Sequence, residues 1–152
     1  MINLIRTNSE HPDFIRLVQL LDADLDARYG AHQEFYSQFN KLDTIHHVII
    51  VYQDEDAVAC GALRKYSDDI VEIKRMFVDA RHRKQGIGKI VLNSLESWAS
   101  ELSYSYCILE SGNKQPEALA LYERAGYYFI SNYGQYATDE NSVCLKKQIG
   151  HE

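Results

Sequence analysis

The hydrophobic pattern of this 152-residue chain changes its period near residue 80, and that change limits the folds open to it. Before it, three runs with strand character, at 45–52, 57–65 and 70–78, are joined by short polar turns, which implies an antiparallel meander. After it, apolar residues recur at helical spacing from Ile87 to Leu102, and another strand-like run follows. The pattern predicts a mixed α/β sheet whose second half contains a strand–helix–strand unit.

The remaining segments complete a single domain. The run at 45–52 is β-branched and almost continuously apolar, which predicts a strand buried on both faces. We expect one α/β (α+β) domain over residues 1–152, with a mixed, mostly antiparallel twisted sheet flanked by about four helices. The other expected elements are strands at 2–6, 104–110, 127–131 and 141–147, helices at 12–29, 87–102 and 116–125, and a helical or irregular stretch at 32–40.

Composition excludes several classes of protein. Hydrophobic residues make up 45% and charged residues 25% of the chain, as in ordinary globular domains. The net charge of −6 disfavours general binding to nucleic acid or to an anionic membrane. The sequence has no signal peptide and no apolar run long enough to cross a membrane, so we expect a cytoplasmic protein. Three cysteines in apolar runs favour buried thiols over a metal site (Cys60, Cys107 and Cys144).

The segment from Val78 to Lys89 carries the clearest chemical signal. A strand ends, a basic loop follows, and Gly86 and Gly88 open the long helix. The first turn of a helix has backbone N–H groups without partners and a partial positive charge, which together suit a phosphate. Four basic residues crowd this turn (Arg81, Arg83, Lys84 and Lys89). The alternative is a solvated basic loop, but the glycine spacing and the strand-to-helix context favour phosphate. Neither a P-loop nor a Rossmann pattern fits these glycines.

Two motifs resemble one family. Arg83-x-x-Gly86-x-Gly88 is similar to the [RQ]-x-x-G-x-[GA] acetyl-CoA signature of the GCN5-related N-acetyltransferases (GNAT). The segment 118–127 resembles the A-x-x-L-Y-x-x-x-G-[FY] helix and strand of the same family. The resemblance spans about 45–147 and implies a GNAT-like acyl-CoA N-acyltransferase fold. It further implies an acetyl-CoA-dependent N-acetyltransferase that needs no metal.

The resemblance also implies where the cofactor binds. The pyrophosphate would lie on the N–H groups of the glycine loop, and the pantetheine arm would pair with the backbone of the preceding strand. An amine would then attack the thioester directly, without an acyl-enzyme. The cofactor-binding residues expected on this basis are Met76, Phe77, Val78, Arg83, Lys84, Gln85, Gly86, Ile87, Gly88, Lys89, Gln115 and Tyr122.

Two side chains are candidates for catalysis. Tyr122 falls on the family position whose hydroxyl protonates the departing thiolate, although it could instead pack its helix. Glu72 is a carboxylate in an apolar strand, and similar enzymes place a general base on this strand. The alternative for Glu72 is an ion pair with Lys74 or with a cation on a neighbouring strand. Arg75 has the opposite strand parity, unless a bulge changes the face that it joins.

One position departs from the family pattern. Many members carry Asn seven residues before the tyrosine, where this chain has Gln115. Glutamine can make the same amide hydrogen bonds with a longer reach, and Asn113 is close enough to substitute. Glu110, at the end of its strand, would either line the acceptor side or be solvated.

The acceptor is less well defined. The resemblance implies a pocket built by the first two helices and the loop between the last two strands, and carboxylates with tyrosines there suit a cationic amine. We expect a small-molecule or peptide amine and leave a homodimer open. For Asp22 and Asp26 a solvated helix face is favoured, whereas Tyr133 and Tyr136 are better candidates. The full set is Asp22, Asp26, Glu34, Tyr36, Asn132, Tyr133, Tyr136 and Asp139.

Three functions stay open at this stage. The first is an amine acetyltransferase, which both motifs and Tyr122 support. The second is a non-catalytic acyl-CoA sensor, which the retention of Tyr122 and Glu72 argues against. The third is a nucleotide-binding module, which the absence of P-loop and Rossmann patterns disfavours.

Overall fold

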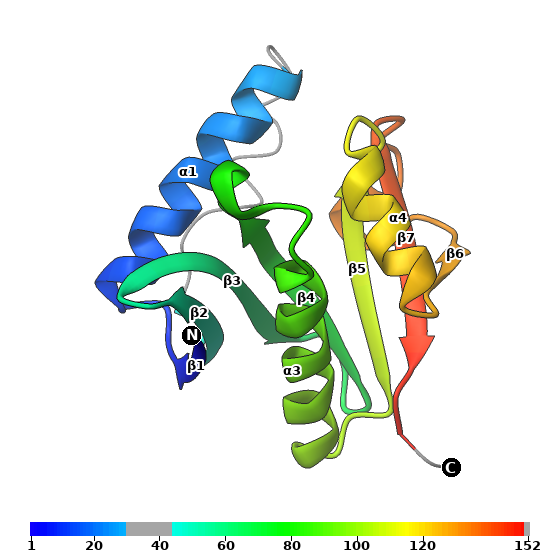
Figure 1. The fold of residues 1–152 in the computed structure, drawn as a ribbon. Coiled ribbons are helices and arrows are strands. Elements are labelled where there is room, and N and C mark those ends of the chain that lie inside the picture. The colour runs from blue at the N-terminus through cyan, green and yellow to red at the C-terminus, as the bar shows by residue number, and fades with distance from the viewer. Residues whose placement is uncertain (30–43, 151–152) are drawn as a thin grey trace.

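The computed structural model describes residues 1–29 and 44–150, which form a seven-stranded sheet with helices on both faces (Figure 1). The strands lie in the order β1-β2-β3-β4-β5-β7-β6. Going along the chain, the elements are β1 (Ile2–Thr7), α1 (Pro12–Tyr29), β2 (His47–Gln53), β3 (Asp56–Lys65), β4 (Ile70–Val78), the single-turn helix η2 (Ala80–His82), α3 (Ile87–Glu101), β5 (Tyr106–Gly112), α4 (Pro116–Arg124), β6 (Tyr128–Ile130), the single-turn helix η3 (Gly134–Tyr136) and β7 (Ser142–Gln148).

The strand directions confirm the meander and the strand–helix–strand unit. Each strand from β1 to β4 pairs antiparallel with the next one in sequence. In the second half, β7 lies between β5 and β6 and pairs antiparallel with both. Only β4 and β5 pair parallel in the described part of the chain, and α3 connects them. Strand β5 begins at Tyr106, two residues later than expected, because the chain turns back from α3 through Ser103 in a left-handed conformation (φ 72°). The sheet is thus mixed and mostly antiparallel.

Two hydrophobic clusters cover the two faces of the sheet. On one face α1 packs through Phe14 and Leu17 against Val48 and Ile50 of β2. On the other face α3 packs against the same strand, where Ile49 and Val51 point, and α4 joins this cluster through Tyr122. Strand β2 is therefore buried on both faces, as its unbroken apolar run predicts. The three cysteines are buried and free, which confirms their reading as small core residues.

The helix count differs from the expected one. The described residues hold three α-helices and two single-turn helices, whereas about four helices were predicted. The predicted stretch at 32–40 lies outside the described residues. No helix in the described ranges is long and apolar enough to span a membrane.

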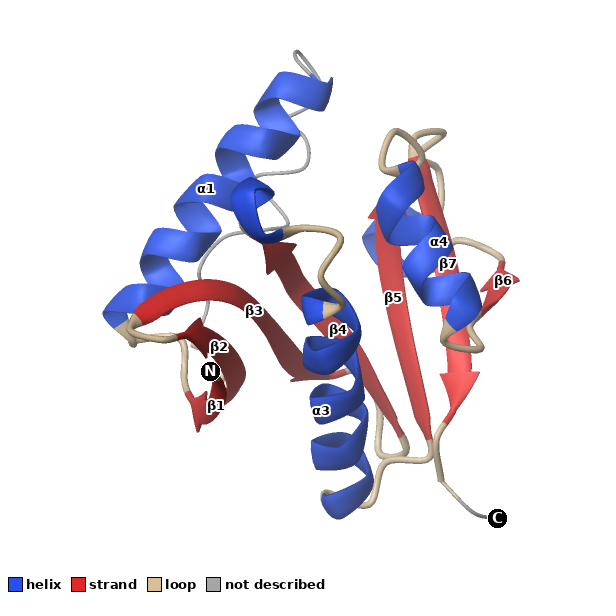
Figure 2. Ribbon diagram, viewed as in Figure 1, coloured by secondary structure: helices blue, strands red, loops and turns tan. Residues whose placement is uncertain are grey.

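The sheet opens between β4 and β5. Their pairing covers only Ile70 to Ile73 of β4 and ends where Ile73 lies opposite Leu109. Beyond that point the strands diverge, and Figure 2 shows the gap between them. The register of β3 with β4 shifts between Cys60 and Ala62, opposite Arg75, which has a left-handed φ of 59°. This β-bulge bends β4 and separates its second half from β5. From the sequence, the face of β4 that Arg75 joins depends on whether the strand has a bulge there, and the structure has one.

Candidate active site

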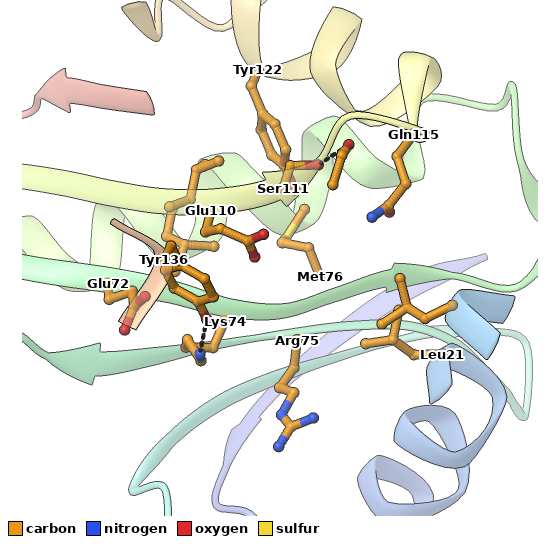
Figure 3. Close-up of a pocket in the computed structure, with 14 residues that line it drawn as sticks. Leu21, Glu72, Lys74, Arg75, Met76, Glu110, Ser111, Gln115, Tyr122 and Tyr136 are labelled. Atoms are coloured by element: carbon orange, nitrogen blue, oxygen red, sulfur yellow. Dashed lines mark hydrogen bonds between the residues drawn. The ribbon is translucent and has the colours of Figure 1, made fainter. Parts of the chain in front are cut away.

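A cleft occupies the gap between the diverging strands (Figure 3). Strands β4 and β5 form its two walls, and α1, α4 and η3 contribute side chains around them. The lining residues are Leu21, Leu25, Glu72, Ile73, Lys74, Arg75, Met76, Leu109, Glu110, Ser111, Gly112, Gln115, Tyr122 and Tyr136. Because a sheet cannot leave backbone groups inside a dry core without partners, an opening of this kind is suited to a strand-like ligand.

The glycine loop has the backbone geometry of an anion site. Lys84 and Gly86 both adopt left-handed conformations (φ 65° and 80°), and Gly86 begins α3 without any side-chain cap. A Cβ built on Gly86 meets nothing within 4 Å, so this part of the loop is open. Gly88 has a different reason to be glycine, since a Cβ there would lie 3.2 Å from Leu121 Cδ2. The exposed N-terminal turn of α3 therefore keeps N–H groups for an incoming anion.

The basic residues of this loop do not all face the glycines. The Arg83 Nε donates to the Val78 carbonyl (2.9 Å), and Arg83 also lies 3.6 Å from Asp24 on α1. Arg81 pairs with Asp79 at 3.3 Å on the surface. Lys84, Gln85 and Lys89 are exposed beside the glycines, and Ile87 is buried in the core. Sequence reasoning placed Arg83 on the phosphate, whereas in this structure its guanidinium ties the loop to β4 and α1.

The three expected residues of β4 divide between different environments. Met76 lines the cleft. Phe77 is buried in the cluster on the α1 face, and Val78 packs on the α3 face. In β4 the residues beyond Ile73 pair with β3 and leave their other edge toward the gap. Any role of Phe77 and Val78 toward a cofactor therefore belongs to their backbone.

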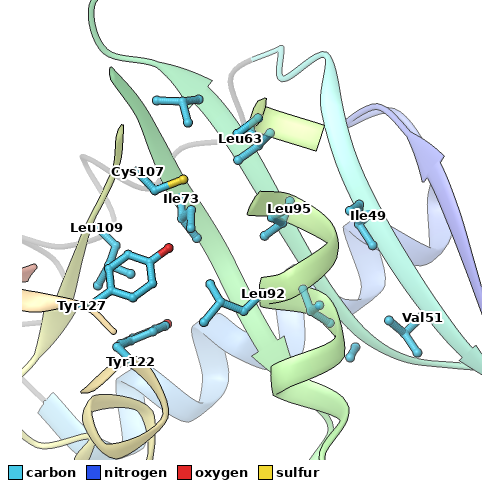
Figure 4. Close-up of a cluster of buried hydrophobic side chains, with 14 of the residues drawn as sticks. Ile49, Val51, Leu63, Ile73, Leu92, Leu95, Cys107, Leu109, Tyr122 and Tyr127 are labelled. Carbon is cyan, nitrogen blue, oxygen red and sulfur yellow. The ribbon is translucent and has the colours of Figure 1, made fainter. Parts of the chain in front are cut away.

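Tyr122 is both a core residue and a lining residue. It is 6% exposed and makes an edge contact with Tyr127, at 6.0 Å between ring centroids (Figure 4). Burial, with a smaller contribution from Glu110, raises the pKa of the Tyr122 hydroxyl well above its usual value. The hydroxyl stays protonated over the working range of an enzyme, which a proton donor requires.

Gln115 lies at the same end of the cleft as Tyr122. It immediately precedes α4, and its carbonyl accepts the N–H groups of Ala118 and Leu119. Its side chain makes no capping bond and points toward the cleft in Figure 3. Asn113 does not substitute for it, because Asn113 is exposed and its amide donates to the Glu140 carbonyl (3.5 Å).

Two carboxylates line the cleft, a buried one on β4 and a half-buried one on β5. Glu72 on β4 is 7% exposed, and its Oε2 accepts a 2.7 Å hydrogen bond from the Tyr133 hydroxyl. Glu110 on β5 accepts a 2.7 Å bond from the Ser142 hydroxyl. Burial raises the pKa of Glu110 to about 7, although Ser142 and Lys74 oppose that shift. From the sequence, Glu110 was expected either to line the acceptor side or to be solvated, and the structure places it in the cleft lining. Its position at the end of a strand was the feature of the sequence that indicated this.

Lys74 lies between these carboxylates without forming an ion pair with either. Its ammonium group donates to the Tyr136 hydroxyl (3.2 Å) and lies 5.8 Å from the centre of that ring. Burial lowers the pKa of Lys74, whereas the charges of Glu72 and Glu110 act in the opposite direction. Among the described residues Glu72 forms no ion pair with Lys74, which was one form of its expected alternative. For the other form, a cation on a neighbouring strand, Arg64 of β3 lies opposite Glu72 in the register.

The expected acceptor residues fall into several groups. Tyr136 lines the cleft, and Tyr133 reaches across from the β6–β7 connection to Glu72. Asn132 and Asp139 instead hold that connection together through the backbone and Ser142. Asp26 is exposed, as favoured. Glu34 and Tyr36 lie outside the described residues.

Asp22 differs from the prediction that it lies on a solvated helix face. It is only partly exposed, and its Oδ1 is buried without a hydrogen-bond partner in the described ranges. Burial raises the pKa of Asp22, while the charge of Arg75 lowers it. Asp22 thus faces the bulge of β4 from α1. Metal-binding groups of three or more His, Cys, Asp or Glu do not occur among the described residues.

Comparisons with known proteins agree with this geometry. A model of the acetyltransferase (GNAT) family matches residues 14–127. The N-acetyltransferase YsnE of Bacillus subtilis, itself uncharacterized, is 30% identical over 100 residues, which are 64% of this chain and 66% of that protein. This chain therefore spans about two thirds of the length of that relative.

Solved structures extend the likeness over almost the whole chain. A Klebsiella pneumoniae protein assigned as an acyl-CoA N-acyltransferase superposes with a TM-score of 0.82, at 27% identity over 98% of both chains. A GNAT acetyltransferase from Elizabethkingia anophelis, solved with acetyl-CoA bound, shares the fold with a TM-score of 0.70 at 18% identity, over 97% of both chains. The fold is that of the acyl-CoA N-acyltransferases. Because the family model covers most of the sequence, the chain belongs to the GNAT family of acetyltransferases.

Proposed function

We propose that this protein transfers the acetyl group of acetyl-CoA directly to a primary amine. The observation that carries the proposal is the parting of β4 and β5 next to the uncapped N-terminus of α3. One opening thus offers an anion site and the edge of β4 beyond the end of its pairing with β5. Acetyl-CoA has the complementary parts, an amide-bearing pantetheine arm and a pyrophosphate.

The residues present fit this cofactor. The free edge of β4 beyond Ile73 offers backbone groups to the pantetheine amides, and the turn at Gly86 offers N–H groups to the pyrophosphate. Lys84 and Lys89 add positive charge beside that turn. Gln115 supplies an amide at the Tyr122 end of the cleft. The relative solved with acetyl-CoA bound has the same fold, which supports the choice of cofactor.

Transfer requires that the amine loses a proton before its nitrogen attacks. Between the two cleft carboxylates, we assign this proton to Glu110, because its pKa of about 7 leaves it able to accept a proton near neutral pH. Glu72, which the sequence suggested, lines the same cleft and is the alternative base. The hydrogen bond from Tyr133 occupies one oxygen of the Glu72 carboxylate. That bond is explained equally well if the role of Glu72 is to orient the tyrosine.

The remaining steps balance without a covalent enzyme intermediate. The amine nitrogen forms a bond to the thioester carbon, the carbon–sulfur bond breaks, and the thiolate takes a proton from the Tyr122 hydroxyl. The nitrogen loses its remaining excess proton to solvent, and solvent returns a proton to the Tyr122 oxygen. A backbone N–H on β4 polarises the thioester carbonyl as negative charge develops on its oxygen. The products are an N-acetylated amine and coenzyme A.

The test is release of coenzyme A from acetyl-CoA in the presence of polyamines, amino acids, aminoglycosides and peptides. Thiol is measured against an enzyme-only blank, because the protein has three free cysteines. We expect release with one class of amine. Gly86→Val should weaken acetyl-CoA binding, since its side chain would occupy the open face of the loop, and a circular dichroism spectrum checks that this variant folds. Saturable acetyl-CoA binding without release by any amine would leave the non-catalytic sensor as the better interpretation.

A further inference from the structure

The ammonium group of Lys74 lines the cleft and has no role in the proposed chemistry. Lys74 is 8% exposed and lines the cleft, yet its one hydrogen bond is to the neutral hydroxyl of Tyr136. Lysine carries three N–H donors when charged. Within the described residues, no carboxylate forms an ion pair with it. Buried charges in proteins are normally paired, so an ammonium with spare donors in a cleft indicates a ligand.

The neighbouring carboxylates do not fill this role. Glu72 is engaged by the Tyr133 hydroxyl, and Glu110 by the Ser142 hydroxyl. Both act on Lys74 through space and not through a hydrogen bond. Around Lys74 the cleft therefore holds an ammonium group and two carboxylates, each bonded to a separate hydroxyl group, and Arg75 is a second cation in the lining. A molecule that carries both a positive and a negative group matches such an arrangement better than a simple cation does.

We propose that Lys74 binds a carboxylate of the acceptor, so that the acceptor is an amino acid. The proposal rests on the transferase function above and names its substrate class. The α-carboxylate accepts hydrogen bonds from the Lys74 ammonium, while the amino group lies toward Glu110 and the thioester. The anionic carboxylate supplies the partner that Lys74 lacks among the described residues, and the amine meets Glu110 on the opposite wall.

The apolar part of the lining indicates the kind of side chain that the amino acid carries. Leu21 and Leu25 reach the cleft from α1, and Met76 lies on β4 beside them. Figure 3 places Leu21 and Met76 toward the Gln115 side, whereas Tyr136 stands over Lys74. Burial of an apolar group against these side chains is favourable, and a charged side chain would lose its hydration there. We therefore expect an apolar or aromatic amino acid.

Matched acceptors test the carboxylate. Leucine is compared with leucinamide and isoamylamine, and phenylalanine with phenylalaninamide and phenethylamine, which keep the apolar body and amine but lose the anion. With the wild-type protein we expect the amino acids to have the highest kcat/KM. In Lys74→Met, the kcat/KM for the amino acid should fall by about tenfold to a hundredfold, as for a lost hydrogen bond to a charged group. The values for the four analogues that lack the carboxylate should stay within about twofold.

A control variant separates this effect from a general change of charge. Lys65→Met removes a lysine from the exposed end of β3, where Lys65 pairs with Asp68, and should leave every acceptor unchanged. Since the basicity of each amine is the same for all variants, the ratio between variants reports Lys74 alone. A melting curve of Lys74→Met confirms that the variant folds.

The outcomes distinguish this inference from the function on which it rests. If isoamylamine is acetylated as well as leucine, or if Lys74→Met affects all acceptors equally, the carboxylate site is wrong and the transferase function stands. If no amine releases coenzyme A, the function fails. In that case calorimetry of leucine binding to the complex with coenzyme A tests the site by itself. Binding that Lys74→Met abolishes supports the site, and no binding to the wild-type protein overturns it.

Discussion

Two clusters in this protein, one half-buried and one buried, contain the same residue types and differ in how their charges are paired. In the closed cluster, Glu96 of α3 accepts hydrogen bonds from Lys147 (2.8 Å) and from Tyr127 (2.9 Å). In the open cluster of the cleft, Lys74 and Glu72 are bonded to tyrosine hydroxyls and not to each other. Both lysines lie 5.8 Å from the centre of a tyrosine ring.

The difference indicates which cluster serves structure and which serves a ligand. Lys147 and Glu96 satisfy one another, so the closed cluster needs nothing from outside the chain. The open cluster keeps hydrogen-bonding capacity toward the cleft, which costs stability unless a ligand uses it. Natural proteins retain such arrangements mainly at functional sites.

The largest effect should come from Glu110→Gln, which removes the proposed base of the open cluster. We expect the rate of transfer to fall by about a hundredfold or more. In the wild-type protein, kcat/KM should rise with pH through about 7 as Glu110 loses its proton. Glu72→Gln is the matched control on the other wall. If Glu72→Gln removes that pH dependence and Glu110→Gln keeps it, the base is Glu72.

Glu110 also predicts a pH dependence of stability. Its pKa is raised in the folded protein to about 7, so the group favours the folded state below its unfolded pKa of about 4.5. That contribution is lost as the pH rises from there through about 7. Glu110→Gln should therefore be more stable than the wild-type protein at pH 8 and gain less at pH 5. Urea unfolding at the two pH values measures the difference, and an equal effect at both would contradict the raised pKa.

The next largest effect should be a difference in the free energy of unfolding between variants of Lys147 and of Lys74. Lys147→Met leaves the Glu96 carboxylate without its cation, and we expect a loss of about 1–3 kcal/mol in the free energy of unfolding. Lys74→Met breaks no ion pair, so its change should stay within about 1 kcal/mol of zero. Urea denaturation of both variants gives the comparison. Equal losses would mean that the two clusters do not differ as described.

Substitutions of two neighbouring tyrosines compare the open and the closed cluster by their effects on activity. Tyr122 lines the cleft, whereas Tyr127 belongs to the closed cluster, although their rings touch. Tyr122→Phe should lower kcat about tenfold or more with the affinity for acetyl-CoA nearly unchanged. Tyr127→Phe should lower stability and leave kcat in place. Loss of folding in Tyr122→Phe would assign Tyr122 to the core alone.

The smallest effect is expected from the hydrogen bond to Glu72. Tyr133→Phe removes a donor to a partly buried carboxylate and should lower stability by about 1 kcal/mol. If Tyr133 also orients Glu72 in the cleft, KM for the acceptor should change while the affinity for acetyl-CoA does not. Substrate titrations of this variant separate the two readouts. An unchanged KM would make the bond purely structural.

Much of the fold and one end of the candidate site could be predicted from the sequence. The unbroken apolar run of β2 predicted burial on both faces, and the spacing of Gly86 and Gly88 predicted an open helix start. Both succeed because they depend on a few neighbouring residues. The contacts of Arg83 could not be predicted in this way, since its guanidinium bonds to a strand carbonyl and lies beside Asp24 of another helix.

The choice between Glu72 and Glu110 shows the same limit. Both are carboxylates in apolar strands, and nothing in their neighbours along the chain ranks them. Their ranking depends on the burial of Glu110, which raises its pKa and which segments distant in sequence create together. Gln115 kept its expected position, whereas Asn113, two residues earlier, faces the β7 side and not the cleft.

By itself the sequence determined the order of the elements, the meander, the glycine turn and the family motifs, because hydrophobic period and turn chemistry are local properties of the chain. Only the tertiary structure decided where β4 leaves β5, that Lys74 has no carboxylate partner in the described chain, and that burial raises the pKa of Glu110. These features depend on the bulge at Arg75 and on groups brought together from distant segments. Charge pairing and dehydration are properties of that assembled environment, which no local pattern specifies.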